Sequence, residues 1–105
     1  MKREQVEAWL RARVPGRPEP LAQQMSRLVA GCPETMLAGA ATMSASLGML
    51  GLRTLSGVTG NRPNDERLAM ELLAADAFVT YAFEAAAEEE VAMAPFALWL
   101  VREAA

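Results

Sequence analysis

Apolar residues recur along the chain at the spacing of helices rather than of strands. In the first segment Val6, Trp9, Leu10 and Val14 fall on one face, with Glu and Arg between them. This pattern predicts an amphipathic helix over about residues 2–14. The segment VPGRPEP ends that helix, because proline cannot continue a helix interior.

The middle of the chain predicts two more helices. Apolar positions mark one over about 20–30, which ends before Gly31, a residue that suits a helix C-terminus. Pro33 and Glu34 suit the first turn of the next helix, since proline lacks the amide hydrogen that would be unpaired there and glutamate complements the helix dipole. We expect this third helix to run over 34–55, where a glycine- and proline-containing segment interrupts the pattern.

The C-terminal part predicts a long helix over 64–90 with Asn64 as its cap, and a short one over 95–104 with Pro95 in its first turn. The glutamate run 88–90 opposes the helix dipole, so the long helix either frays there or continues to Pro95. No segment shows the alternation of a strand. The prediction is therefore an all-α protein, a compact bundle of four to five helices that forms one domain over residues 1–105.

Composition supports helices and removes several kinds of chemistry. Of 105 residues 52% are hydrophobic but only 6% aromatic, and Ala, Leu and Met, which supply most of the apolar content, favour helices. No histidine is present, so the commonest general base and a common zinc ligand are missing. Without a histidine partner, we interpret the single cysteine, Cys32, as a buried or incidental thiol rather than a nucleophile. We expect no catalytic activity, no metal and no cofactor.

Charge is distributed unevenly along the chain. Residues 1–62 carry eight basic and four acidic side chains, whereas residues 63–105 carry two basic and nine acidic ones. The two parts should attract each other, within one chain or between two. Glutamates interrupt the basic N-terminal segment and no aromatic ladder accompanies it, so we expect no nucleic-acid binding.

Residues 36–52 carry no charge, so the segment could cross a membrane, fill a core or form a surface that another chain covers. It is at the lower length limit for a membrane span, contains three glycines and lacks flanking aromatic residues, so we do not expect a span. Near the N-terminus, Glu4 and Glu7 stand where an export signal would be apolar. We therefore expect a cytoplasmic protein.

Projected on a helix, the uncharged segment places a ridge of large side chains beside a groove of small ones. The small residues lie four apart, a spacing that lets another helix approach closely. The candidate helix-packing or interface groove consists of Ala40, Ser44, Gly48, Met43, Leu47 and Leu50.

A polar seam is the second candidate site. Asp76, Thr80 and Glu84 are four residues apart on the long predicted helix and so lie on one face. Their carboxylates could bind a cation or a basic ligand, or the seam could form ion pairs with arginines such as Arg53. We expect the second, because two carboxylates alone are poorly specific. The glutamate run 88–90 is interpreted as a solvated face.

Residues 62–88, RPNDERLAMELLAADAFVTYAFEAAAE, resemble the helix that follows the first aspartate-rich motif of trans-prenyl diphosphate synthases. The magnesium-binding DDxxD motif of that family is absent from the chain. No catalytic residue is therefore carried over, and we interpret the resemblance as one of composition. It rests on Arg62, Pro63, Asp76, Ala77, Phe83 and Glu84.

The sequence leaves three functional hypotheses. The first is a small non-catalytic protein that acts through protein–protein contacts and self-associates through the third and fourth predicted helices. The alternative is a small-ligand or lipid-binding bundle with a pocket between those helices, where Arg53, Asp76 and Glu84 orient the polar end of the ligand. The third is a membrane-associated protein held by residues 36–52.

Overall fold

The computed structural model describes residues 1–13, 16–60 and 65–105, and these ranges contain six helices and no strand. The all-α prediction is confirmed, with one helix more than the four to five expected. Val14 and the expected cap Asn64 lie outside the described residues. The helices are α1 Arg3–Arg11, α2 Glu19–Gly31, α3 Glu34–Ala38, α4 Met43–Gly60, α5 Asp65–Glu88 and α6 Met93–Ala104.

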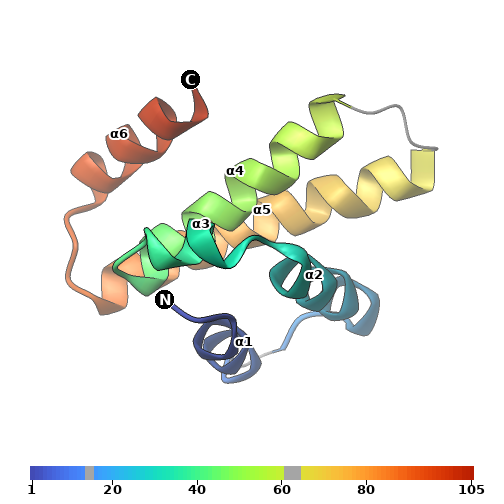
Figure 1. The fold of residues 1–105 in the computed structure, drawn as a ribbon, viewed down its shortest axis with the longest axis horizontal. Coiled ribbons are helices and arrows are strands. Elements are labelled where there is room, and N and C mark those ends of the chain that lie inside the picture. Colours follow the sequence, from blue (N-terminus) through green and yellow to red (C-terminus); the bar gives the residue numbers. More distant parts are fainter. Residues whose placement is uncertain (14–15, 61–64) are drawn as a thin grey trace.

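The hairpin of α4 and α5 is the centre of the fold. These two helices share the largest interface between elements, with α1 and α2 on one side of the pair and α6 on the other (Figure 1). Gly51 lies where α4 and α5 approach each other, since a Cβ atom there would be 2.8 Å from Val79 Cγ2 and 3.3 Å from the carbonyl oxygen of Ala75. The absence of a side chain at this position therefore sets how closely the two longest helices pack.

Side chains from all six helices fill the interior. The molecule measures 39 × 31 × 24 Å and has a radius of gyration of 13.1 Å, as expected for a compact domain of this length. The Cys32 side chain is buried, in keeping with its interpretation as a buried thiol. The largest fully buried side chains are Phe78, Leu10, Met25, Leu37, Leu47, Leu50, Val6, Val29, Cys32, Ser44 and Ser46.

The predicted helix over 34–55 was wrong as a single element. It is two helices, because α3 ends at Ala38 and α4 starts at Met43 and continues to Gly60. At the start of α4 the Thr42 hydroxyl oxygen accepts a hydrogen bond from the Ala45 amide, 3.1 Å away. This is the geometry of a helix N-cap, and it places the break four residues after the end of α3.

Glu89 completes the cap of α4 from a distant part of the chain. One of its carboxylate oxygens accepts hydrogen bonds from the amides of Met43 and Ser44, at 3.0 and 3.3 Å, and the other accepts one from the Ser44 hydroxyl. Together with the Thr42 cap, these bonds satisfy three consecutive amides that have no partner within the helix. The expectation that the 88–90 glutamates form a merely solvated face was therefore wrong for Glu89.

The C-terminus of α5 lies two residues before the predicted end at 90. The amide of Val91 donates to the carbonyl of Ala86 at 2.9 Å, and that of Glu90 donates to Ala87 at 3.1 Å. This is the Schellman pattern, in which one residue adopts a left-handed conformation, and Glu90 does so with φ 59°. The chain thus turns sharply after Glu88 and directs Glu89 toward the start of α4.

Candidate interaction surface

The predicted groove residues lie largely inside this chain. Ala40 is in the loop between α3 and α4, so it does not continue the face that Ser44 and Gly48 form on α4. At Gly48 the groove is occupied by α6, because an added Cβ atom would be 3.0 Å from Leu100 Cδ1 and 3.2 Å from Trp99 Cζ3. Met43 is half-buried, and the remaining members of the set are buried: Ala40, Ser44, Gly48, Leu47 and Leu50.

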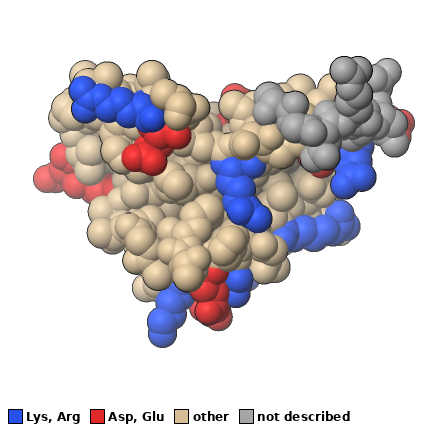
Figure 2. Space-filling model, turned by 45° about the horizontal axis from the view of Figure 1, so that its top comes forward, with Lys and Arg blue, Asp and Glu red and all other residues tan. Residues whose placement is uncertain are grey.

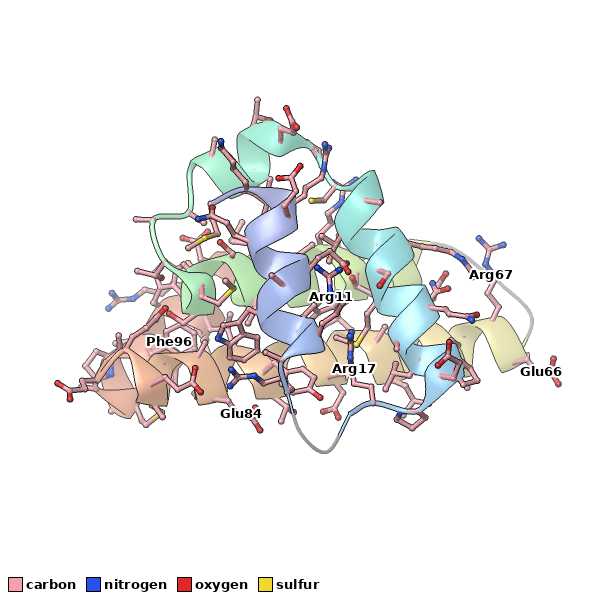
Figure 3. The ribbon with its side chains drawn as sticks, turned by 90° about the horizontal axis from the view of Figure 1, so that it is seen from below. Arg11, Arg17, Glu66, Arg67, Glu84 and Phe96 are labelled. Carbon is pink, nitrogen blue, oxygen red and sulfur yellow. The ribbon has the colours of Figure 1, made fainter. Side chains whose placement is uncertain are left out.

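The predicted polar seam lies on the outer face of α5. Asp76, Thr80 and Glu84 are exposed, and none forms a hydrogen bond or ion pair with another described residue. Figure 3 shows Glu84 directed away from the protein. Arg53 is also exposed, but it is a residue of α4 and lies at a different part of the surface, beside Leu28 and Thr54. The structure therefore does not bring Arg53 to the seam.

No cluster of three or more histidine, cysteine or carboxylate side chains in the described part of the chain has metal-binding geometry. Among the described helices, none combines the length and the apolar character needed to cross a bilayer.

Trp9, Arg13 and Glu88 form an anchor between the N-terminal segment and α5. The Trp9 indole N–H donates to one Glu88 carboxylate oxygen at 3.2 Å, and the Arg13 guanidinium donates to the other at 2.5 Å. The guanidinium also stacks on the Trp9 ring at 3.9 Å from its centroid, a cation–π arrangement. Trp9 meets Tyr81 of α5 edge to face, with the ring centroids 5.9 Å apart. These contacts link the basic and acidic parts of the chain.

The anchor keeps the Glu88 carboxylate ionised. The hydrogen bond from Arg13 lowers the pKa of Glu88 most, the hydrogen bond from Trp9 and the charge of Arg13 lower it further, and partial desolvation opposes them. A carboxylate with a lowered pKa is a poor general acid or base at neutral pH. Glu88 therefore acts as a structural acceptor, a role that the prediction of a solvated face missed.

Acidification is expected to loosen the anchor. Because folding lowers the pKa of Glu88 from its ordinary value of 4.5, its contribution to stability is present above that value and is lost as the pH falls through the folded-state pKa. In a Trp99→Phe variant, Trp9 is the only tryptophan, and its emission should change as the pH falls from neutral through the lowered pKa of Glu88, below 4.5. Glu88→Gln in the same background should already show the altered emission at neutral pH. Identical emission in both proteins across this range would contradict the anchor.

One side of the hairpin carries apolar side chains that α6 leaves uncovered. On α4, Leu52 and Leu55 follow Gly48 by one and two turns on the side that faces α6. On α5, Phe83 packs against Phe96 of α6 with centroids 5.1 Å apart, so its side of the helix also faces α6. Val79 and Leu72 share that side of α5. We call Leu52, Leu55, Leu72 and Val79 the hairpin shelf.

The hairpin shelf is partly open to solvent. Figure 1 shows α6 beside the first half of α4, while the hairpin extends beyond it. Leu55 and Leu72, in that extension, are 42% and 43% exposed. Large aliphatic side chains gain most when they are fully removed from water, so the shelf is a surface suited to a further apolar element.

The outer side of α6 is a second exposed apolar surface. Ala94, Leu98 and Val101 follow one another at spacings of four and three residues and so lie on one face, opposite the Phe96 and Leu100 side chains that face the core. Leu98 is 50% exposed and Val101 is 66% exposed. We call Ala94, Leu98 and Val101 the α6 ridge. The apolar run FALWLV, which is apolar around the whole helix, was the sequence signal for it.

No protein-family model, curated protein or solved structure matches this chain.

Proposed function

We propose that this chain is a non-catalytic cytoplasmic protein that acts through protein–protein contacts, and that it binds a second copy of itself. The observation that carries the proposal is the pair of exposed apolar surfaces, the hairpin shelf and the α6 ridge. Several exposed large apolar side chains on one side of a protein are typical of interaction sites. The chain exposes 6381 Å² in total, of which an interface of standard size would cover about 800 Å² on each partner.

A second copy is the partner that uses both surfaces at once. In a two-fold dimer, each contact occurs twice, because residue i of one copy meets residue j of the other and the reverse. The α6 ridge lies on a single helix and the hairpin shelf lies on two neighbouring helices, and in the proposed dimer each ridge packs on the opposite shelf. The ridge and the shelf of each protomer are then buried, and the closed dimer leaves neither surface exposed.

Charges beside the two surfaces favour the same arrangement. Arg102 is exposed next to Val101 of the α6 ridge, and Asp76 is exposed one turn after Leu72 of the hairpin shelf. Neither forms an ion pair with another described residue of its own chain. A ridge seated on the opposite shelf brings Arg102 of one copy near Asp76 of the other, and such complementarity steers association and fixes its register.

Aspartate substitutions test which surface carries the association. Leu72→Asp on the hairpin shelf and Leu98→Asp on the α6 ridge are each expected to weaken dimerisation at least tenfold, because each introduces an unpaired charge into the buried contact. Leu73→Asp is the matched control, since Leu73 is a neighbouring exposed leucine of α5 that points away from the shelf. Sedimentation equilibrium measures the dissociation constants. Equal weakening by Leu72→Asp and Leu73→Asp would contradict the assignment of the shelf.

Charge reversal tests the register of the two copies. Asp76→Arg and Arg102→Asp should each weaken dimerisation, because each places like charges together across the interface. The double variant should recover the wild-type dissociation constant to within about threefold. If the double variant is weaker than either single variant, the proposed pairing of ridge and shelf is wrong.

A further inference from the structure

We propose that the open cleft between α2, α4 and α5 binds a small amphiphilic anion, with the acid group at Arg53 and the apolar body against Leu28 and Leu50. This inference does not depend on self-association. The cleft has a volume of about 460 Å³, within the range of small-molecule sites. Its described lining is Leu28, Leu50, Arg53, Thr54, Ser56, Gly57 and Glu71.

Two leucines supply the apolar side chains of the described lining. Leu50 is 1% exposed and belongs to the core, and Leu28 of α2 packs against that core. The Thr54 hydroxyl donates to the carbonyl oxygen of Leu50 at 2.8 Å, so its hydrogen is already used within α4. Two leucines and an internally bonded threonine favour an aliphatic group over a strongly solvated one.

The rim of the cleft offers a positive charge that the described protein does not neutralise. Arg53 is exposed and forms no hydrogen bond or ion pair with any described residue, so its planar guanidinium can bind a carboxylate through two hydrogen bonds. Glu71, also in the lining, is engaged by Arg67, with Arg67 Nε 3.4 Å from its carboxylate. The favoured ligand charge at Arg53 is therefore negative.

The charged residues around the cleft also favour a negatively charged ligand. A neighbouring cleft of about 620 Å³ shares Glu71 and is lined by Gln24, Arg27, Glu66, Arg67 and Met70. The described linings of the two clefts thus contain three arginines and two glutamates. Figure 2 shows basic side chains gathered on the right-hand half of one face of the molecule. A field of this sign raises the local concentration of anions.

The cleft differs from the pocket predicted between the third and fourth helices. Gly51 closes the direct α4–α5 interface, and the opening lies instead where α2 leaves part of α4 exposed. Of the three residues expected to orient a ligand, Arg53 lines the cleft, whereas Asp76 and Glu84 do not.

Octanoate is the probe, because it joins one carboxylate to an unbranched apolar chain. Titration of the full chain, followed through amide NMR shifts, should give saturable shifts at Thr54 and Gly57. Arg53→Gln should weaken the binding at least tenfold. Arg11→Gln is the control, because Arg11 is exposed and pairs with Glu7 of its own helix. Equal binding by wild type and Arg53→Gln, or no saturable shift at the cleft, would overturn the proposal.

Two further experiments test separately how the apolar part and the anionic part of the ligand contribute to binding. Gly57→Leu should abolish octanoate binding without unfolding the chain, since an added Cβ atom meets no heavy atom of the described residues within 4 Å beyond its chain neighbours and its own helix backbone, and the side chain can enter the cleft. Octanamide, which lacks the charge, should bind at least tenfold more weakly than octanoate. Octanamide binding as tight as octanoate, or inorganic phosphate binding as tight as octanoate, would show that the ligand class is wrong.

Discussion

A Gly51→Leu variant is expected to lose about 3 kcal/mol of folding free energy, because overfilling a packed helix interface forces the backbones apart. The first added atom already lies 2.8 Å from Val79 Cγ2. Val79 can change its rotamer, but the Ala75 carbonyl oxygen at 3.3 Å is backbone and cannot move without shifting α5. Urea denaturation followed by circular dichroism measures the loss.

Gly57→Leu is the matched control for this effect. It introduces the same side chain into the same helix, at a position where an added Cβ atom meets no atom of another described element within 4 Å. Relief of the low helix propensity of glycine should stabilise α4 by up to about 1 kcal/mol. If the two variants shift the denaturation midpoint in the same direction and by the same amount, the close α4–α5 crossing at Gly51 is contradicted.

Glu89→Ala is expected to destabilise the fold by about 2 kcal/mol. It removes the acceptor of the Met43 and Ser44 amides and of the buried Ser44 hydroxyl. Loss of a helix cap costs about 0.5–2 kcal/mol, and the upper end of this range is expected because two amides and the Ser44 hydroxyl lose their bonds to Glu89, leaving the hydroxyl only its 3.1 Å contact with the Thr42 hydroxyl. The same denaturation experiment measures the change.

Glu84→Ala serves as the control for the cap. Glu84 is exposed on α5 and forms no ion pair with another described residue, so its removal should change the unfolding free energy by less than about 0.5 kcal/mol. An equal loss in both variants would mean that removal of any glutamate near this end of α5 has the same effect, and the cap would then carry no special stability.

The sequence predicted the helical class and most helix positions because apolar spacing and proline or glycine signals act locally. It missed the break at residues 39–42, since the apolar pattern continues through it. Thr42 was a local signal for a helix start, but the Glu89 carboxylate that completes the cap comes from the end of α5. The glutamate run left the end of α5 open between fraying and continuation to Pro95, because Glu90 occupies a left-handed position where glycine is the usual signal.

For the candidate sites too, the sequence predicted which residues share a face of one helix but not how different helices pack against each other. Four-residue spacing correctly placed Asp76, Thr80 and Glu84 on one exposed face of α5. The pairing with Arg53 required knowing how α4 is rotated against α5, which spacing does not reveal. The cleft at Arg53 depends on where α2 crosses α4, and the hairpin shelf depends on how much of the hairpin α6 covers.

The mass of the chain in solution tests the central claim of self-association most directly. Light scattering after size-exclusion chromatography should give a molar mass that rises from 11.3 kDa toward twice that value as the protein concentration increases from micromolar to millimolar. The rise should disappear in Leu72→Asp and persist in Leu73→Asp. A constant mass of 11.3 kDa for the wild-type chain across the whole range would contradict the account.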